Sequence, residues 1–235
     1  MTLFGTDGIR GKYGNFPLDD LTIKKIGYSI VKSFDNTVKK IIVGHDGRES
    51  CTAILESLID GINFINNYEI INLELFPTPS LPVILSKNDS GDAIGIEITA
   101  SHNPYSDNGI KIFNRDGYKI SSELETQIEE IVASQHDLNK TSDIRFLDSR
   151  PMRSLYIDFI SNILSSIKRC SISLNIAIDC ANGATSHVID DITLPNNISL
   201  SIFNNSPNGK NINDKCGAVH PEYLSKLISD INEKN

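Results

Sequence analysis

Apolar residues recur at helical spacing in several stretches of the first half of the chain, and short apolar runs separate these stretches. An apolar residue at every third or fourth position predicts an amphipathic helix, whereas a short apolar run between turn residues is typical of a buried strand. On this basis we predict helices over 17–34, 48–65 and 121–134, with a short helix ending near 87. We predict strands over 40–43, 69–76, 92–99 and 110–113. The alternation of the two patterns predicts an α/β domain with a mixed sheet.

The pattern dissolves into polar residues between positions 136 and 150, where we place a domain boundary. The first domain is expected to cover 1–145 and the second 150–235. In the second domain we expect the following elements: a helix over 151–167, a strand over 174–179, a strand-to-helix turn over 182–186, a strand over 198–203 and a helix over 221–231. Two strands are a thin basis for an independent core, so we expect this second α/β domain to be truncated in the chain.

Composition narrows the class of protein. The 235 residues are 39% hydrophobic and carry a formal net charge of −8, and no stretch gathers enough Lys or Arg to overcome that field, so we expect no nucleic-acid partner. The chain has neither a basic leader nor an apolar run long enough to cross a bilayer, so we expect a cytoplasmic protein without a membrane partner. The four cysteines show no metal-ligand spacing, which predicts reduced thiols and makes a zinc site improbable.

The segment from Thr99 to Lys111 carries the strongest chemical signal. A predicted strand delivers Ser101 to a polar turn, and a second extended run returns Lys111 toward the same end of the sheet. A serine there could act as a nucleophile or as a phosphoryl carrier. The residues alone leave open a plain turn, in which Ser101 and Asn103 bond the backbone. A serine hydrolase is less favoured, because His102 is adjacent to Ser101 and no nucleophile elbow is present.

Two further segments suggest anion binding more weakly. At the N-terminus, glycines surround Arg10, so the backbone could approach a phosphate that the guanidinium grips; a mobile terminal arm is an equally good interpretation. Small residues over 179–184, together with segment 207–217, allow a tight turn into a helix N-terminus, although a structural role is favoured. The sequence names no partner for a further set of basic side chains, which we interpret as surface or packing residues: Lys12, His45, Arg48, His187 and His220.

Taken together, four groups of residues resemble the α-D-phosphohexomutase family, and most closely its phosphoglucosamine mutase branch. They occur in the family's order and span nearly the whole chain: Phe4-Gly5-Thr6-Asp7-Gly8-Ile9-Arg10-Gly11, then Ala100-Ser101-His102-Asn103-Pro104 with Asp107-Asn108-Gly109-Ile110-Lys111, then Asp179-Cys180-Ala181-Asn182-Gly183-Ala184-Thr185, and Pro207-Asn208-Gly209 to Gly217. The serine loop is the segment most specific to the family. The N-terminal octet and the Asn-Gly-Ala-Thr segment favour the glucosamine branch.

The resemblance implies interconversion of glucosamine 6-phosphate and glucosamine 1-phosphate, a step toward UDP-N-acetylglucosamine and peptidoglycan. Ser101 would be a phosphoserine that gives its phosphoryl group to the sugar monophosphate and recovers the other phosphate from the bisphosphate. Lys111 would be the general acid or base and Arg10 the arginine beside the phosphoserine, both of them binding substrate together with Asn103, while His102 would shape the site. Mg²⁺ would bind the phosphate on Ser101.

The chain also departs from the family pattern. The Asp-Gly-Asp-Gly-Asp-Arg metal loop and the family's third and fourth domains do not occur in it. A single phosphate oxygen cannot hold Mg²⁺ firmly, so we expect the chain alone to bind metal poorly and to turn over little. Glu97 and Thr99 stand where the family usually has an apolar and a small residue, and His45 and Cys51 are further departures; we expect these changes to alter packing without touching the chemistry.

Three alternatives therefore remain open: a phosphoglucomutase or phosphomannomutase, a catalytically dead remnant, and one half of a split enzyme whose partner chain supplies the missing domains.

Overall fold

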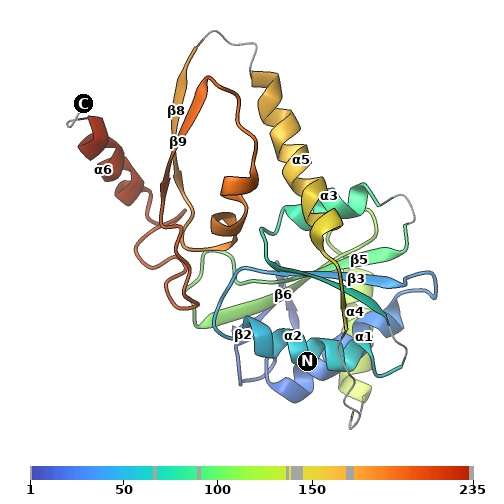
Figure 1. Ribbon diagram of the computed structural model, residues 1–235. Coiled ribbons are helices and arrows are strands. Elements are labelled where there is room, and N and C mark those ends of the chain that lie inside the picture. The colour runs from blue at the N-terminus through green and yellow to red at the C-terminus, as the bar shows by residue number, and fades with distance from the viewer. Residues whose placement is uncertain are drawn as a thin grey trace.

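One mixed sheet of seven strands forms the centre of the first part of the chain, in the order β1-β2-β6-β5-β3-β4-β7 (Figure 1). The computed structural model describes residues 2–65, 68–88, 91–135, 138, 145–167 and 172–232. The strands are β1 Phe4–Gly5, β2 Gly8–Lys12, β3 Lys40–His45, β4 Glu69–Leu75, β5 Ala93–Ile98, β6 Asp107–Phe113 and β7 Phe146–Leu147. The pairs among β1, β2, β6 and β5 are antiparallel, whereas β3 runs parallel to β5 and β4, and β4 to β7. The predicted mixed α/β fold is confirmed.

Helices cover both faces of this sheet, as Figure 1 shows. On one face lie α1 Asp20–Ser33, α2 Cys51–Ile62 and α4 Ser122–Ser134, which share the larger apolar core with the sheet. On the other face lie α3 Ser80–Ser86 and α5 Arg150–Ser166, which share the smaller core. Helix α1 begins later than predicted because Asp19 caps it, its Oδ1 accepting a bond from the Thr22 amide at 3.0 Å.

Three strands were not predicted. The N-terminal octet, which glycines made equally compatible with a mobile arm, forms β1 and β2, and β2 pairs with β6 about a hundred residues later. The mobile-arm interpretation is therefore wrong, because backbone hydrogen bonds to β6 order this segment. The sequence did not show the strand, because the glycines interrupt the alternation of apolar and polar side chains that marks a strand. The two-residue strand β7 lies in the polar stretch where no element was expected. Positions 139–143 of the predicted boundary lie outside the described residues.

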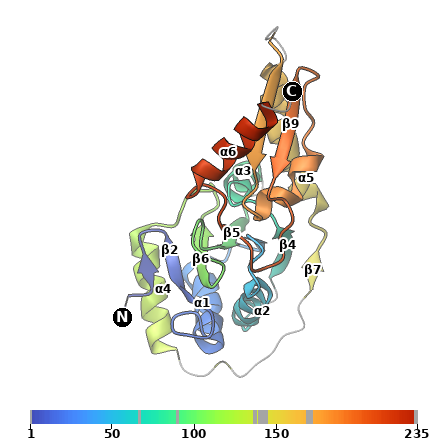
Figure 2. The ribbon, with the colours of Figure 1, turned by 90° about the vertical axis from the view of Figure 1, so that its left-hand side faces the viewer.

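The second part of the chain contains a separate two-stranded parallel sheet of β8 Leu174–Asp179 and β9 Ile198–Phe203. Helix α6 Pro221–Asn232 follows, and Figure 2 shows this C-terminal unit projecting from one face of the seven-stranded sheet. The predicted strand-to-helix turn at 182–186 leads into a short 3₁₀ helix, Ala184–His187, followed by a second one, Ile189–Asp191. No long helix therefore starts behind that turn.

Helix α5 joins the two units on the α3 face of the sheet. The rings of Tyr156 and Phe76 meet edge to face with centroids 5.6 Å apart, and the Arg153 guanidinium lies 4.7 Å from the Phe76 centroid. Arg153 also donates to the carbonyl of Leu73 at 2.7 Å. Among the described helices, none has both the length and the apolar character required to cross a bilayer.

Candidate active site

Ser101 lies immediately after β5, in a loop that returns the chain to β6. It is exposed, whereas Ala100 just before it is fully buried. Its φ of 56° is in the left-handed region. This conformation costs a residue with a side chain about 1–3 kcal/mol, and it persists only where surrounding contacts offset that cost. The loop must therefore be fixed by strong contacts.

Arg48, just before α2, supplies most of these contacts. Its side chain is fully buried and donates to the carbonyls of Ser101 at 3.0 Å, Asn103 at 3.2 Å and Asp107 at 2.8 Å, and also to the carbonyl of Pro104. Its Nε donates to Asp46 Oδ2 at 2.8 Å. One rigid guanidinium thus binds four backbone carbonyls of the serine loop. Arg48 was interpreted as a surface or packing residue; the structure shows a buried residue, so the surface alternative is wrong, and its contacts with the serine loop were not predicted.

A second support comes from the C-terminal unit. Asn213 donates through Nδ2 to the carbonyls of Ser101 at 2.9 Å and Asn103 at 3.1 Å, two of the four that Arg48 binds. Nearby, the Glu49 amide donates to the carbonyl of Gly209 at 2.9 Å, so segment 207–217 is bonded to the start of α2 as well. The serine loop is therefore held from both units of the fold.

Thr99 connects the loop to the same network. Its hydroxyl donates to Asp46 Oδ2 at 2.6 Å and accepts a bond from the Ser101 amide at 2.9 Å. The Thr99 side chain thus bonds the backbone of the predicted phosphoserine directly, while the expectation that this residue leaves the chemistry untouched stays a prediction. Asp46 thus joins Thr99 to Arg48 beneath the loop.

Arg10 reaches the serine loop across the neighbouring strand. In the β2–β6 register it lies opposite Gly109, and it donates to the carbonyl of Thr99 at 3.2 Å. A Cβ on Gly109 would lie 2.7 Å from Arg10 Cδ and 2.6 Å from the Thr99 oxygen, so only glycine leaves room for this crossing. Arg10 therefore binds the backbone two positions before Ser101, and its side chain is still 30% exposed to solvent.

Lys111 and Arg10 share a carboxylate that the sequence did not single out. Asp7 Oδ2 lies 2.9 Å from Lys111 Nζ and 2.8 Å from Arg10 Nη2. Partial burial opposes it, but the bonds and charges of Lys111 and Arg10 lower the pKa of Asp7 below its usual value. A phosphate dianion entering this site would compete with Asp7 for both cations.

The two remaining predicted site residues lie in the loop itself. His102 is exposed, and Asn103 is half-buried with its Nδ2 donating to Asp107 Oδ2 at 2.9 Å. The structure therefore brings Ser101, Asn103, Arg10 and Lys111 to one end of the sheet. It uses the amide of Asn103 to brace the loop.

Beneath the site lies the carboxyl group of Glu97, a residue that we expected from the sequence to alter packing. Glu97 on β5 is fully buried, and Oε1 accepts a weak bond from the Thr78 hydroxyl at 3.4 Å. Burial, and next the charge of Asp46, raise its pKa well above the usual value. Glu97 therefore holds a proton at pH values where exposed glutamates are charged.

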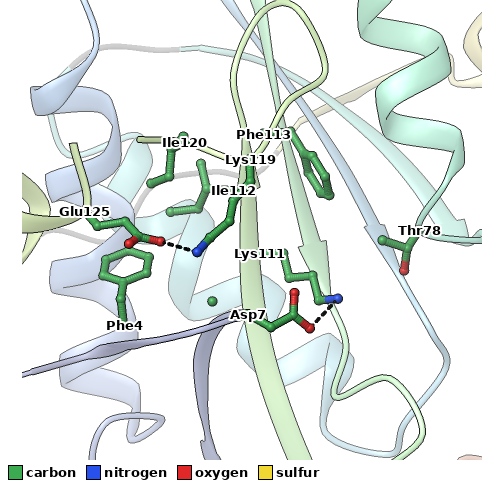
Figure 3. Close-up of a pocket in the computed structure, with 10 residues that line it drawn as sticks. Phe4, Asp7, Thr78, Lys111, Ile112, Phe113, Lys119, Ile120 and Glu125 are labelled. Carbon is green, nitrogen blue, oxygen red and sulfur yellow. Dashed lines mark ion pairs between the residues drawn. The ribbon is translucent and has the colours of Figure 1, made fainter. Parts of the chain in front are cut away.

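A pocket of about 220 Å³ opens beside Lys111 (Figure 3). Its apolar lining residues are Phe4, Ile112, Phe113 and Ile120, and two ion pairs lie at its sides. One pair is Lys111 with Asp7, and the other is Lys119 with Glu125 at 2.9 Å. The cavity is small, so it fits part of a ligand rather than a whole drug-sized molecule.

The residues around Ser101 do not by themselves fit a magnesium ion. Within the described ranges, no three His, Cys, Asp or Glu side chains are grouped so that they could hold a metal. Asp7 is paired with two cations and Asp46 is engaged by Arg48 and Thr99. Mg²⁺ prefers carboxylates plus phosphate in a nearly octahedral shell, so further carboxylates are needed.

Segments 179–184 and 207–217, for which a structural role was favoured, are also bonded to each other. Asp179 Oδ1 accepts from the Ala181 amide and from Asn204, both at 2.9 Å, and its Oδ2 accepts from the Gly217 amide at 2.7 Å. Three of the four cysteines, Cys51, Cys180 and Cys216, are free and buried, and Cys170 lies outside the described residues.

Comparison with known proteins identifies the family. Residues 1–139 match the model of the phosphoglucomutase/phosphomannomutase alpha/beta/alpha domain I. The chain belongs to this phosphohexomutase family. The matched segment contains both the N-terminal octet and the serine loop.

Other phosphohexomutases extend the similarity past that segment. Phosphoglucosamine mutase of Aliarcobacter butzleri is 38% identical over 237 residues, which is 98% of this chain and 52% of that protein. The Fusobacterium nucleatum phosphoglucosamine mutase is 35% identical over 96% of this chain and 50% of its own length. A phosphoglucomutase/phosphomannomutase family structure from Burkholderia thailandensis has a TM-score of 0.74 at 19% identity, over 97% of this chain and 49% of that one. The chain thus spans about half the length of the relatives it matches.

Proposed function

We propose that this protein acts as a phosphoglucosamine mutase, interconverting glucosamine 6-phosphate and glucosamine 1-phosphate. The observation that carries the proposal is an exposed serine, held in the left-handed region by Arg48 and Asn213 at the end of β5, with Arg10 beside it. The similarity to phosphoglucosamine mutases over both units supports the choice of sugar.

In this proposal Ser101 carries the phosphoryl group between turnovers. It gives the group to the free hydroxyl of the sugar monophosphate, and after the bisphosphate has turned over it recovers the other phosphate. Phosphoryl transfer depends on positioning and charge neutralisation, which suits a serine held by a rigid loop near two cations. Lys111 is the general acid or base: its neutral amine accepts the proton of the attacking hydroxyl, and the resulting ammonium returns a proton to the leaving serine oxygen. Arg10 binds phosphate oxygens.

Mg²⁺ is the cation we propose for the phosphate on Ser101, where it would neutralise charge as the group transfers. Because the carboxylates of the described site are already engaged, the remaining ligands must come from elsewhere, either from further sequence or from a partner chain. That requirement keeps the split-enzyme alternative open, and no step of the proposal is assigned to the metal.

The first test is the mass of the purified protein, with all its required domains and Mg²⁺, before and after incubation with glucose 1,6-bisphosphate. A gain of one phosphate that disappears in Ser101→Ala is the expected result. Ser106→Ala is the matched control, because Ser106 is an exposed serine of the same loop and should leave the gain intact. A wild-type protein that takes no phosphate, or takes it equally in Ser101→Ala, would refute the carrier role.

The second test compares glucosamine, glucose and mannose phosphates as substrates of the protein with all its required domains. A preference for glucosamine phosphates is expected. A preference for glucose or mannose phosphates would favour the phosphoglucomutase/phosphomannomutase alternative, and no turnover of any of them would favour a remnant.

A further inference from the structure

Three residues on neighbouring strands form a row across the α3 face of the sheet. In the register of the sheet, Gly44 on β3 lies opposite Glu97 on β5, and Glu97 lies opposite Lys111 on β6. Residues directly opposite each other in a sheet place their side chains on the same face within contact range. Glu97 is therefore the cross-strand neighbour of the proposed acid–base residue.

The Glu97 carboxyl occupies space that is free because residue 44 is a glycine. A Cβ on Gly44 would lie 2.7 Å from Glu97 Oε2, so the carboxyl occupies the place where any other residue at 44 would put its side chain. Oε2 is buried and has no hydrogen-bond partner among the described groups. An ionised carboxylate with an orphaned buried oxygen is costly, which favours the protonated form.

Few charged groups face this carboxyl from the elements around it. Asp46, from the end of β3, repels a charge on Glu97, and Lys111, from β6, attracts it, while the loop before α3 contributes only the Thr78 hydroxyl. Asp46 is already bonded to Arg48 and Thr99. Lys111 is thus the cation that responds to the protonation of Glu97.

We propose that Glu97 is a positioning residue for Lys111: its uncharged carboxyl leaves the ammonium directed outward to Asp7, and its ionisation draws the ammonium inward, away from Asp7. The proposal rests on the proposed function, since it concerns the residue that exchanges a proton there. It explains why a glutamic acid occupies a fully buried strand position behind the site.

The coupling can be measured without any activity. Glutamates are labelled with ¹³C at Cδ, and the Glu97 signal is identified as the one missing from E97Q. In K111M, and in K111Q as a second neutral variant, the midpoint of the Glu97 titration should move to higher pH, because the ammonium that favours the carboxylate is gone. The matched control is K119M, which removes the cation paired with Glu125 at the same pocket and should leave the Glu97 midpoint at its wild-type value.

The positioning role is tested by the pH dependence of phosphoryl transfer from a hexose 1,6-bisphosphate to Ser101, in wild type and E97Q. Where the titration shows Glu97 protonated, the two proteins carry the same charge and should transfer at the same rate. Above that pH their profiles should separate. Glu97 titrating alike in wild type and K111M, or superimposed profiles with normal labelling, would overturn the positioning role alone. An unlabelled Ser101 in the wild type would instead overturn the proposed function and the positioning role with it.

Discussion

Replacing Arg48 with methionine tests whether one buried guanidinium holds the serine loop. The substitution removes five donated bonds, leaves the Asp46 carboxylate without its ion pair, and leaves the carbonyls of Pro104 and Asp107 without this donor. The carbonyls of Ser101 and Asn103 still accept hydrogen bonds from Asn213. Removing one partner of a buried ion pair costs about 3–5 kcal/mol, because the other charge stays buried.

The assay is urea unfolding followed by circular dichroism at constant pH and salt. At about 2–4 °C per kcal/mol for a chain of this size, R48M should also lower the melting temperature by roughly 6–20 °C. R48K keeps the charge but has fewer donors in a different geometry, so its loss should be intermediate. The surface control is R150M, since Arg150 pairs with Asp148 on the exposed side of the molecule and its loss should barely move the midpoint. An R48M midpoint as close to wild type as that of R150M would refute the reasoning.

Three further predictions concern the same site. Asn213→Ala should cost about 1–2 kcal/mol in urea unfolding and speed amide hydrogen exchange in the serine loop, because two loop carbonyls lose a donor; unchanged exchange would contradict this. Gly109→Ala should cost about 1–3 kcal/mol by forcing Arg10 aside, whereas Gly5→Ala, with its nearest contact at 3.6 Å, should be tolerated. Glu97→Gln should gain stability relative to wild type as pH rises above about 4.5, because a carboxyl whose folded pKa is raised loses its stabilising contribution between the unfolded and folded pKa values; urea midpoints across pH, compared for both proteins, test the sign.

Local patterns predicted the elements whose residues carry their own signal. The apolar spacing of Ile23, Ile26 and Ile30 marks α1, and all three are fully buried. Similarly, the apolar runs at 41–43 and 93–96 mark two central strands, because a strand covered on both faces is rich in apolar residues.

The elements that were missed depend on partners far away in the chain. Strand β2 is recognisable only through its pairing with β6, since glycines replace the usual alternation. Arg48 gives no signal in its own neighbourhood, because four of its acceptors are backbone carbonyls more than fifty residues later. Asp7 lies within the N-terminal octet, but its ion pairs with Arg10 and Lys111 could not be predicted, because the fold brings Lys111 to it from more than a hundred residues away.

The double support of the serine loop has a consequence for synthesis on the ribosome. The bond from Asn213 to the Ser101 carbonyl spans 112 positions, whereas that from Arg48 spans 53 in the opposite direction along the chain. Domains generally fold as they emerge, amino end first. The loop can therefore take its shape on Arg48 while the C-terminal unit is still unmade, and its second brace arrives only after more than a hundred further residues have been translated.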